Sequence, residues 1–152
     1  MNYVKKLYNS KGCLQNENLI CIFAKNNKVI KILLAIGTGS FIGGVCRYLL
    51  TQFVQIKFSS LFPFGTLVVN VLGCFLIGVV FGLSSKLHLQ QEWRLFLTTG
   101  LLGGFTTFST FSNEAVELLR EGKLGYAVTY VVLSIFIGLL ATFLGILLSK
   151  FF

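Results

Sequence analysis

The sequence predicts an all-α integral membrane protein with four transmembrane helices, and three observations lead to this fold class. Of the 152 residues, 55% are hydrophobic and 12% are charged. The charged residues fall in short interruptions, which leave four apolar stretches of about 20 residues or more, the length that a bilayer-spanning helix needs. These stretches cover residues 30–54, 64–84, 94–119 and 125–148. The connections between them are short, so neighbouring helices should be antiparallel.

Residues 1–29, which precede the first span, are polar, basic and rich in Asn and Lys. They lack the apolar core and the small-residue cleavage site of a signal peptide. We expect a disordered tail here, so that residues 30–152 form a single four-helix membrane domain.

The first two spans carry small residues at GxxxG spacing, a pattern that lets helix backbones approach closely. Gly39 with Gly43 and Ser40 with Gly44 lie on the first span, and Gly78 with Gly82 lies on the second. A bundle of four helices has little interior in which to shelter polar side chains. Oligomerisation is therefore one interpretation of these pairs, and packing of the same faces within one chain is the alternative.

The second and fourth spans each carry a polar face at helical spacing. On the second span this face consists of Thr66, Asn70 and Gly73. Ser and Thr can bond to the carbonyl of the preceding turn, so each hydroxyl alone can be structural, but the common register indicates a lined path across the membrane. The stripe on the fourth span comprises Tyr126, Tyr130, Ser134, Gly138, Thr142, Gly145 and Ser149.

The third span contains an unusually polar stretch, GLLGGFTTFSTFSNE, at residues 100–114. Gly103 and Gly104 permit backbone angles that other residues resist, and Thr106 and Thr107 can compete for main-chain hydrogen bonds. We therefore expect a broken helix. Non-helical backbone inside a membrane is tolerated only where it is buried in protein or lines a cavity, and there it presents carbonyls to cations and amides to anions.

Three phenylalanines, Phe105, Phe108 and Phe111, recur every third residue along this stretch among hydroxyl side chains. Aromatic stripes usually serve packing. Here the rings would border a polar route, and because a ring edge carries partial positive charge, it can contact a small anion without holding it too tightly to leave.

Two ionisable residues lie within these spans. Arg47 is about two-thirds of the way along the first span, and Glu114 follows the polar run of the third. Each would cost about 2.5–3.5 kcal/mol at a helix centre, so each is a functional hypothesis. Both can instead snorkel to an interface, which is the interpretation we favour for Glu114. For Arg47 we favour the mouth of a water-filled vestibule, where it would attract anions.

The sequence gives no sign of a metal centre built from side chains or of an enzyme. The four cysteines form no CxxC pair and no Cys/His cluster with metal-ligand spacing. The sequence contains no GxxxxGK[ST] nucleotide-binding motif, so no ATP-driven step is expected.

The chain resembles the Fluc (CrcB) fluoride channels in three motifs, which follow one another in the family's order. These are GSFIGGVCRY at 39–48, PFGTLVVNVLGCFLIG at 63–78 and TGLLGGFTTFSTFSNE at 99–114. The resemblance covers residues 32–148, and the third motif is the most specific. The tail is the main departure from the usual compact member.

The resemblance implies an antiparallel, dual-topology dimer with two fluoride pores and a structural sodium ion at its centre. The sodium ligands would be the backbone carbonyls of Gly103 and Thr106 from both subunits. The other implied positions are the pore residues Asn70, Phe108, Phe111, Tyr130 and Ser134, and the vestibule residue Arg47. The implied role is passive export of fluoride through the cell membrane. The partners would be fluoride, lipid and a second subunit, with no nucleic acid.

The second subunit is either an inverted copy or a paralogue, because the positive charges at the helix ends leave both open. Four basic residues lie on one side and three on the other, which is nearly balanced: Lys31, Lys86, Arg94 and Lys150, against Lys57, Arg120 and Lys123. The basic tail adds charge to the first side, so it should favour a cytoplasmic amino terminus.

Two other functions stay open at this point. A proton-coupled exporter can also be a four-span antiparallel dimer, but it would need a membrane-embedded acid, and the first span holds Arg47 and no carboxylate. A non-transporting assembly subunit would explain four helices, but neither the break nor the hydroxyl stripe.

Overall fold

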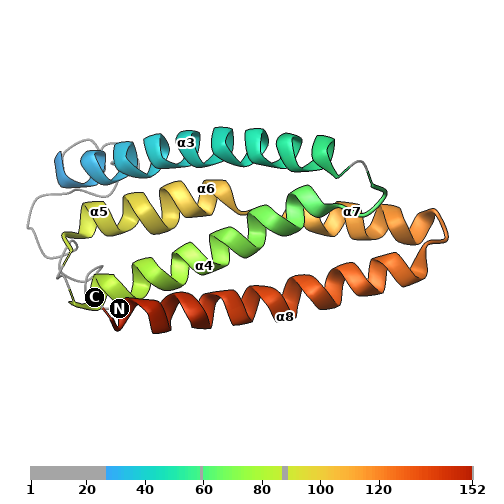
Figure 1. The fold of residues 1–152 in the computed structure, drawn as a ribbon. Coiled ribbons are helices and arrows are strands. Elements are labelled where there is room, and N and C mark those ends of the chain that lie inside the picture. The colour runs from blue at the N-terminus through green and yellow to red at the C-terminus, as the bar shows by residue number, and fades with distance from the viewer. Residues whose placement is uncertain (1–26, 59, 87–88, 152) are drawn as a thin grey trace, which may run out of the picture.

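The computed structural model describes residues 27–58, 60–86 and 89–151, and within these ranges it contains helices and no strand. Figure 1 shows an elongated bundle in which α3 and α8 lie along opposite edges of the view. The helices are α3 (Asn27–Lys57), α4 (Phe64–Lys86), α5 (Gln91–Leu95), the π-helix η1 (Phe96–Leu102), α6 (Gly103–Phe105), α7 (Phe108–Arg120) and α8 (Leu124–Ser149). The predicted all-helical fold class is confirmed. The predicted tail lies outside the described residues, except that residues 27–29 belong to α3.

Three helices of the described part are long and apolar enough to cross a membrane: Val29–Lys57, Phe64–Ser84 and Leu124–Ser149. They contain the first, second and fourth predicted spans. The third predicted span, residues 94–119, is distributed over α5, η1, α6 and α7. We call this part of the chain, from α5 to α7, the third segment.

The backbone of the third segment departs from helical geometry at two threonines. Thr106 (φ −81°, ψ 156°) and Thr107 (φ −146°, ψ 116°) are extended, and α7 begins directly after them. Gly103 has ordinary helical angles (φ −65°, ψ −36°), and among the described glycines only Gly122, in the turn before α8, has a positive φ. The expectation that Gly103–Gly104 supplies unusual backbone angles is therefore wrong. Figure 1 shows the resulting non-helical connection between α6 and α7.

Gly39 and Gly43 of the first span serve close packing against the third segment. A Cβ atom at Gly39 would lie 2.7 Å from the carbonyl oxygen of Phe96, and one at Gly43 would overlap the carbonyl oxygen of Leu101. From the other side, a Cβ at Gly104 would lie 2.6 Å from the carbonyl oxygen of Ser40. Only glycine allows the backbones to approach this closely.

Gly78 and Gly82 likewise allow α4 to pack closely against α8. These two helices make the most extensive contact in the bundle. A Cβ at Gly78 would overlap the carbonyl oxygen of Thr142, and one at Gly82 would overlap the hydroxyl of Ser149. The pairs Gly39–Gly43 and Gly78–Gly82 thus pack within the chain, which was the alternative to oligomerisation. A Cβ at Gly44 would meet nothing within 4 Å, so the Ser40–Gly44 pair leaves both interpretations open.

Most of the hydroxyl stripe on α8 does not line a path. Gly138, Gly145 and Ser149 are buried against α4. Thr142 donates to the carbonyl of Gly138 at 3.1 Å, so its hydroxyl is satisfied within its own helix. The predicted path along the whole stripe is therefore wrong. Tyr130 and Ser134 lie nearer the start of α8, beyond this packed part.

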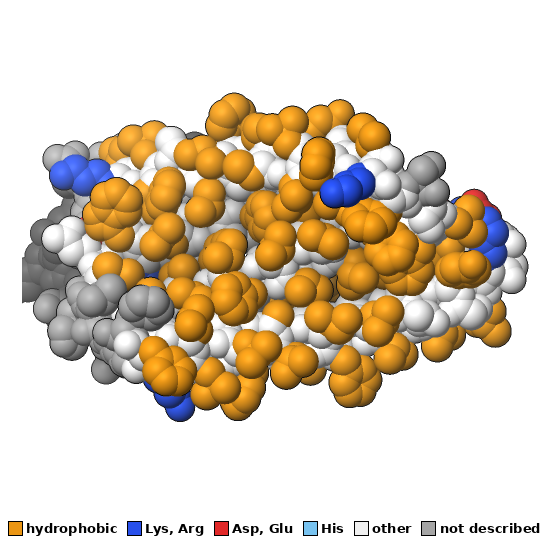
Figure 2. Space-filling model, viewed as in Figure 1, with side chains coloured by type: hydrophobic (Ala, Val, Ile, Leu, Met, Phe, Trp, Pro, Cys, Tyr) orange, Lys and Arg blue, Asp and Glu red, His pale blue; other side chains and the backbone are white. Residues whose placement is uncertain are grey.

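The buried core lies where α4, α7 and α8 meet, near the loop that precedes α4. It is made of Phe62, Leu67, Ala115, Leu118, Ala127 and Tyr130. Large apolar side chains cover the outer face (Figure 2). A surface of this kind suits lipid, which is as apolar as these side chains.

Candidate functional site

The extended residues of the third segment are held by the polar face of α4. The side-chain oxygen of Asn70 accepts a hydrogen bond from the backbone N–H of Thr107 at 2.8 Å. The side-chain nitrogen of Asn70 donates to the carbonyl of the same residue at 3.1 Å. Three residues further along α4, Gly73 leaves room for Thr106, because a Cβ there would overlap the threonine methyl group. The predicted pore residue Asn70 therefore lies at the break, with its amide bonded to the backbone.

Glu114 links the three elements of the core. It receives hydrogen bonds from the hydroxyls of Thr66 on α4 and Tyr130 on α8, each at 2.7 Å. Tyr130 is completely buried. Two donors from neighbouring helices thus hold the carboxylate of Glu114, which is only partly buried. The expectation that it lies near an interface stays a prediction. The sequence placed Thr66 on a polar face but gave no sign of its partner, which lies 48 residues away.

Aromatic rings connect this carboxylate to the outside of the subunit. The rings of Phe111 and Tyr130 lie 5.0 Å apart, and those of Phe108 and Phe111 lie 5.8 Å apart. The exposed fraction is 79% for Phe108, compared with 0% for Tyr130. The rings thus form a ladder that begins at the buried Tyr130, which is bonded to the partly buried Glu114, and ends on an open face. Phe105, the third member of the predicted stripe, lies instead on α6, next to Gly73.

Two of the other predicted residues carry polar atoms without a partner. The hydroxyl oxygen of Ser134 and the Nε atom of Arg47 are buried and make no hydrogen bond within the described structure. A buried polar group without a partner is costly, so both positions have unused capacity to bind water or an ion. Arg47 lies on α3 and Ser134 on α8.

The two carbonyls expected to bind sodium have lost their helical donors. In a continuous α-helix the carbonyl of Gly103 would accept from the N–H of Thr107, and that of Thr106 from the N–H of Thr110. Here the N–H of Thr107 bonds to Asn70, and the N–H of Thr110 bonds to the hydroxyl of Thr107 at 3.3 Å. Backbone carbonyls freed in this way are suitable ligands for a sodium ion. The described residues offer no cluster of His, Cys, Asp or Glu for a metal.

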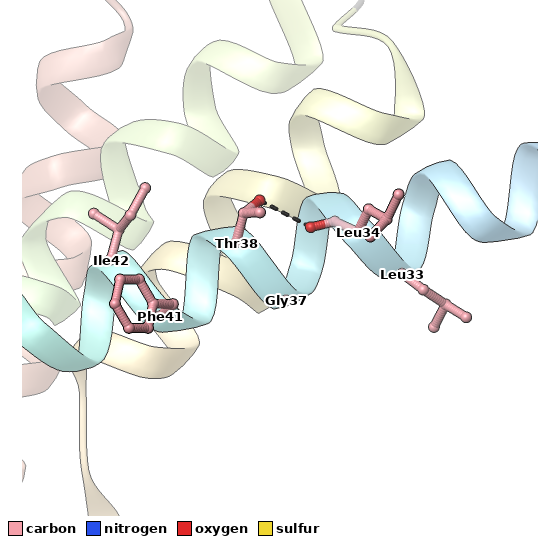
Figure 3. A pocket seen from close by; sticks show the side chains of 6 residues that line it. All are labelled: Leu33, Leu34, Gly37, Thr38, Phe41 and Ile42. Carbon is pink, nitrogen blue, oxygen red and sulfur yellow. Dashed lines mark hydrogen bonds between the residues drawn. The ribbon is translucent and has the colours of Figure 1, made fainter.

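Two hollows differ in their relation to this site. A cavity of about 130 Å³ reaches Glu114 and is lined by Leu61, Pro63, Glu114, Glu117, Leu118 and Glu121. A larger groove of about 460 Å³ lies on the outer face of α3 (Figure 3) and is lined by Leu33, Leu34, Gly37, Thr38, Phe41 and Ile42. Its one hydroxyl, on Thr38, donates to the carbonyl of Leu34 at 2.8 Å. The groove is therefore apolar in practice and is not part of the site.

Comparison with known proteins identifies relatives across this whole region. The chain is 48% identical over 121 residues to a protein of Phocaeicola vulgatus, an alignment that covers 80% of this chain and 100% of the relative. It is 41% identical over 122 residues to a protein of Flavobacterium psychrophilum, covering 80% of this chain and 98% of that relative. It is 47% identical over 113 residues to a protein of Shewanella oneidensis, and this alignment covers 74% of this chain and 91% of that relative. Each of the three relatives is named "Fluoride-specific ion channel FluC".

The family assignment agrees with these relatives. The family described as "CrcB-like protein, Camphor Resistance (CrcB)" matches residues 34–146. This range includes the polar face of α4, the extended threonines, the aromatic ladder and Glu114. Together with the spans, it makes the chain a multi-pass membrane protein, and the chain belongs to the CrcB family.

Proposed function

We propose that this protein is a fluoride-selective ion channel of the cell membrane and that it exports cytoplasmic fluoride passively, which lowers fluoride toxicity. It is not an enzyme. The observation that carries the proposal is the ladder from Glu114 through Tyr130 and Phe111 to Phe108, beside the extended threonines, in a chain whose relatives are named fluoride-specific channels.

The chemistry of the ladder suits a small anion. Moving bare fluoride into a low-dielectric core would cost tens of kcal/mol, so the route has to replace its hydration shell. The ring edges of Phe108 and Phe111 and the hydroxyls of Tyr130 and Ser134 would supply this replacement. Asn70 borders the same route, and Arg47 would attract the anion at the vestibule. Fluoride that enters a cell as neutral HF dissociates in the more alkaline cytoplasm, and the membrane potential drives the anion outward.

An antiparallel, dual-topology dimer would complete the route. The ladder ends on Phe108, whose ring is 79% exposed, so one subunit leaves the outer end of the ladder uncovered. A second subunit covering this face would enclose it. Either an inverted copy or a paralogue can take this place.

A sodium ion at the dimer centre would be held by the carbonyls of Gly103 and Thr106, and it would supply a fixed positive charge close to the anion route. At ~10 Å such a charge contributes about 1.7 kcal/mol at an effective dielectric of 20. The loss of helical donors at both carbonyls supports this assignment.

Efflux from liposomes that contain the purified protein tests the proposed function. Fluoride should leave rapidly once a potassium ionophore is added to balance charge, and chloride should not. If protein-free liposomes released fluoride as fast as liposomes that contain the protein, the proposal would be refuted.

One observation favours the proton-coupled exporter, because Glu114 is an acid that hydroxyls of two neighbouring helices hold in a partly buried position. The same assay separates the two functions. A channel conducts fluoride down its gradient without moving protons, whereas a proton-coupled exporter moves protons together with its substrate and therefore changes the internal pH.

A further inference from the structure

The N–H of Thr107 donates a hydrogen bond to the side chain of Asn70 at the point where the third segment stops being helical. A continuous helix would direct this N–H to the carbonyl of Gly103. Instead it donates to the oxygen of Asn70 at 2.8 Å, and the nitrogen of Asn70 donates back to the carbonyl of Thr107 at 3.1 Å. The pair of bonds resembles the pairing of two strand residues, which matches the extended angles of Thr107 (φ −146°, ψ 116°).

Other residues around Asn70 also accommodate the extended backbone of the third segment. Gly73 lies one turn from Asn70, and any side chain at this position would overlap the methyl group of Thr106. Thr107 is buried, and its hydroxyl accepts from the N–H of Thr110 and donates to the hydroxyl of Thr110. Asn70 therefore fixes the non-helical backbone from one side, and Gly73 gives it space.

The amide of Asn70 has little capacity left for an ion. An asparagine side chain offers two N–H donors and one carbonyl oxygen, and one donor and the oxygen are bonded to Thr107. At most one N–H remains to face an anion. Asn70 is bonded mainly to the backbone of Thr107, and this bonding affects the carbonyl of Gly103, which would otherwise accept from the same N–H.

We propose that Asn70 is a positioning residue that creates the cation site, because it withdraws the N–H of Thr107 from the carbonyl of Gly103 and so leaves this carbonyl free to bind sodium. This inference rests on the proposed sodium site. It assigns to Asn70 a role that contact with fluoride does not include: loss of its side-chain oxygen would let the helix close and would occupy the carbonyl with a hydrogen bond.

Two substitutions at Asn70 separate the two halves of this arrangement. Asn70→Leu removes donor and acceptor, whereas Asn70→Asp keeps an oxygen in the position that accepts from Thr107. Ser84→Ala is the matched control, since Ser84 is a polar residue of the same helix about four turns away. Two readouts are needed: the amide proton shift of Thr107, measured by NMR in lipid, and the stabilisation of the protein against heat as sodium replaces N-methylglucamine.

In Asn70→Leu, the Thr107 amide shift should change and sodium affinity should fall by roughly 10–100-fold, the usual effect of losing a residue that orients a metal ligand. Ser84→Ala should retain both, and Asn70→Asp should retain sodium affinity, because its oxygen can still accept from the N–H of Thr107.

An unchanged Thr107 amide in Asn70→Leu would overturn the proposal, as would a changed amide with wild-type sodium affinity. If Asn70→Leu does not assemble, Asn70→Asp decides through sodium affinity, which must not fall below the wild-type value, because its oxygen still accepts from the N–H of Thr107. If wild-type protein binds no sodium, the sodium site fails separately and the assignment of Asn70 falls with it, while fluoride efflux still tests the channel.

Discussion

Gly43 and Gly44 are neighbours on α3 with opposite surroundings, and they form a matched pair for testing how the third segment packs. A Cβ at Gly43 would overlap the carbonyl oxygen of Leu101 and lie 2.9 Å from the backbone nitrogen of Phe105. A Cβ at Gly44 would meet no heavy atom within 4 Å. Both glycines lie inside the same helix, so replacement by alanine gains about 1 kcal/mol of helix propensity at each.

Because this gain cancels in the comparison, the difference between the two variants is the packing cost alone. Overpacking a well-filled contact costs about 1–3 kcal/mol. The atoms struck at Gly43 belong to the backbone of the third segment and cannot rotate away as a side chain would. We therefore expect Gly43→Ala to be less stable than Gly44→Ala by an amount near the upper end of this range.

Reversible unfolding in mixed detergent and SDS measures the difference. Gly37→Ala provides a second control, because a Cβ there also meets nothing within 4 Å. Cross-linking should accompany the titration, so that an effect of Gly44 on subunit association is seen separately. If Gly43→Ala and Gly44→Ala unfold at the same SDS fraction, then α3 does not pack against the third segment as described.

Three further substitutions test the ladder and the α4–α8 contact. Phe111→Ile keeps apolar volume but removes a ring edge, so fluoride efflux should fall sharply with little change in thermal stability; unchanged efflux would make the ring a packing residue. Tyr130→Phe removes one donor to Glu114 and should cost about 0.6–1.7 kcal/mol in SDS unfolding, a loss that should shrink once Glu114 is Gln. Gly145→Val would drive a branched side chain into the carbonyl of Phe75, and correctly assembled protein at wild-type yield on gel filtration would contradict this packing.

Much of the fold and part of the site follow from the sequence. Hydrophobic length gave the three long helices, because a bilayer demands about 20 apolar residues from any spanning helix. Helical spacing placed Thr66, Asn70 and Gly73 on one face of α4, and this face does contact the third segment. The dense motif of residues 99–114 pointed to the family that the comparisons show. These properties depend on neighbours within one helix or one short stretch, so one-dimensional patterns carry them.

Tertiary structure decided what each face contacts. Small residues at GxxxG spacing look alike whether their partner is a second chain or another helix of the same chain, and only the packed bundle assigns Gly39, Gly43, Gly78 and Gly82 to intrachain contacts. The extended backbone lies at Thr106–Thr107 instead of Gly103–Gly104, since the amide of Asn70 supplies hydrogen bonds there.

Glu114 shows the same limit for charge. A carboxylate near the end of an apolar run is expected at the membrane surface, but the sequence does not show that hydroxyls from two other helices donate to this partly buried one. Those donors are 48 and 16 residues away in the chain. The cost of burying a charge depends on the hydrogen-bond partners that surround it in space. Contacts between residues far apart in the chain can be seen only in the tertiary structure.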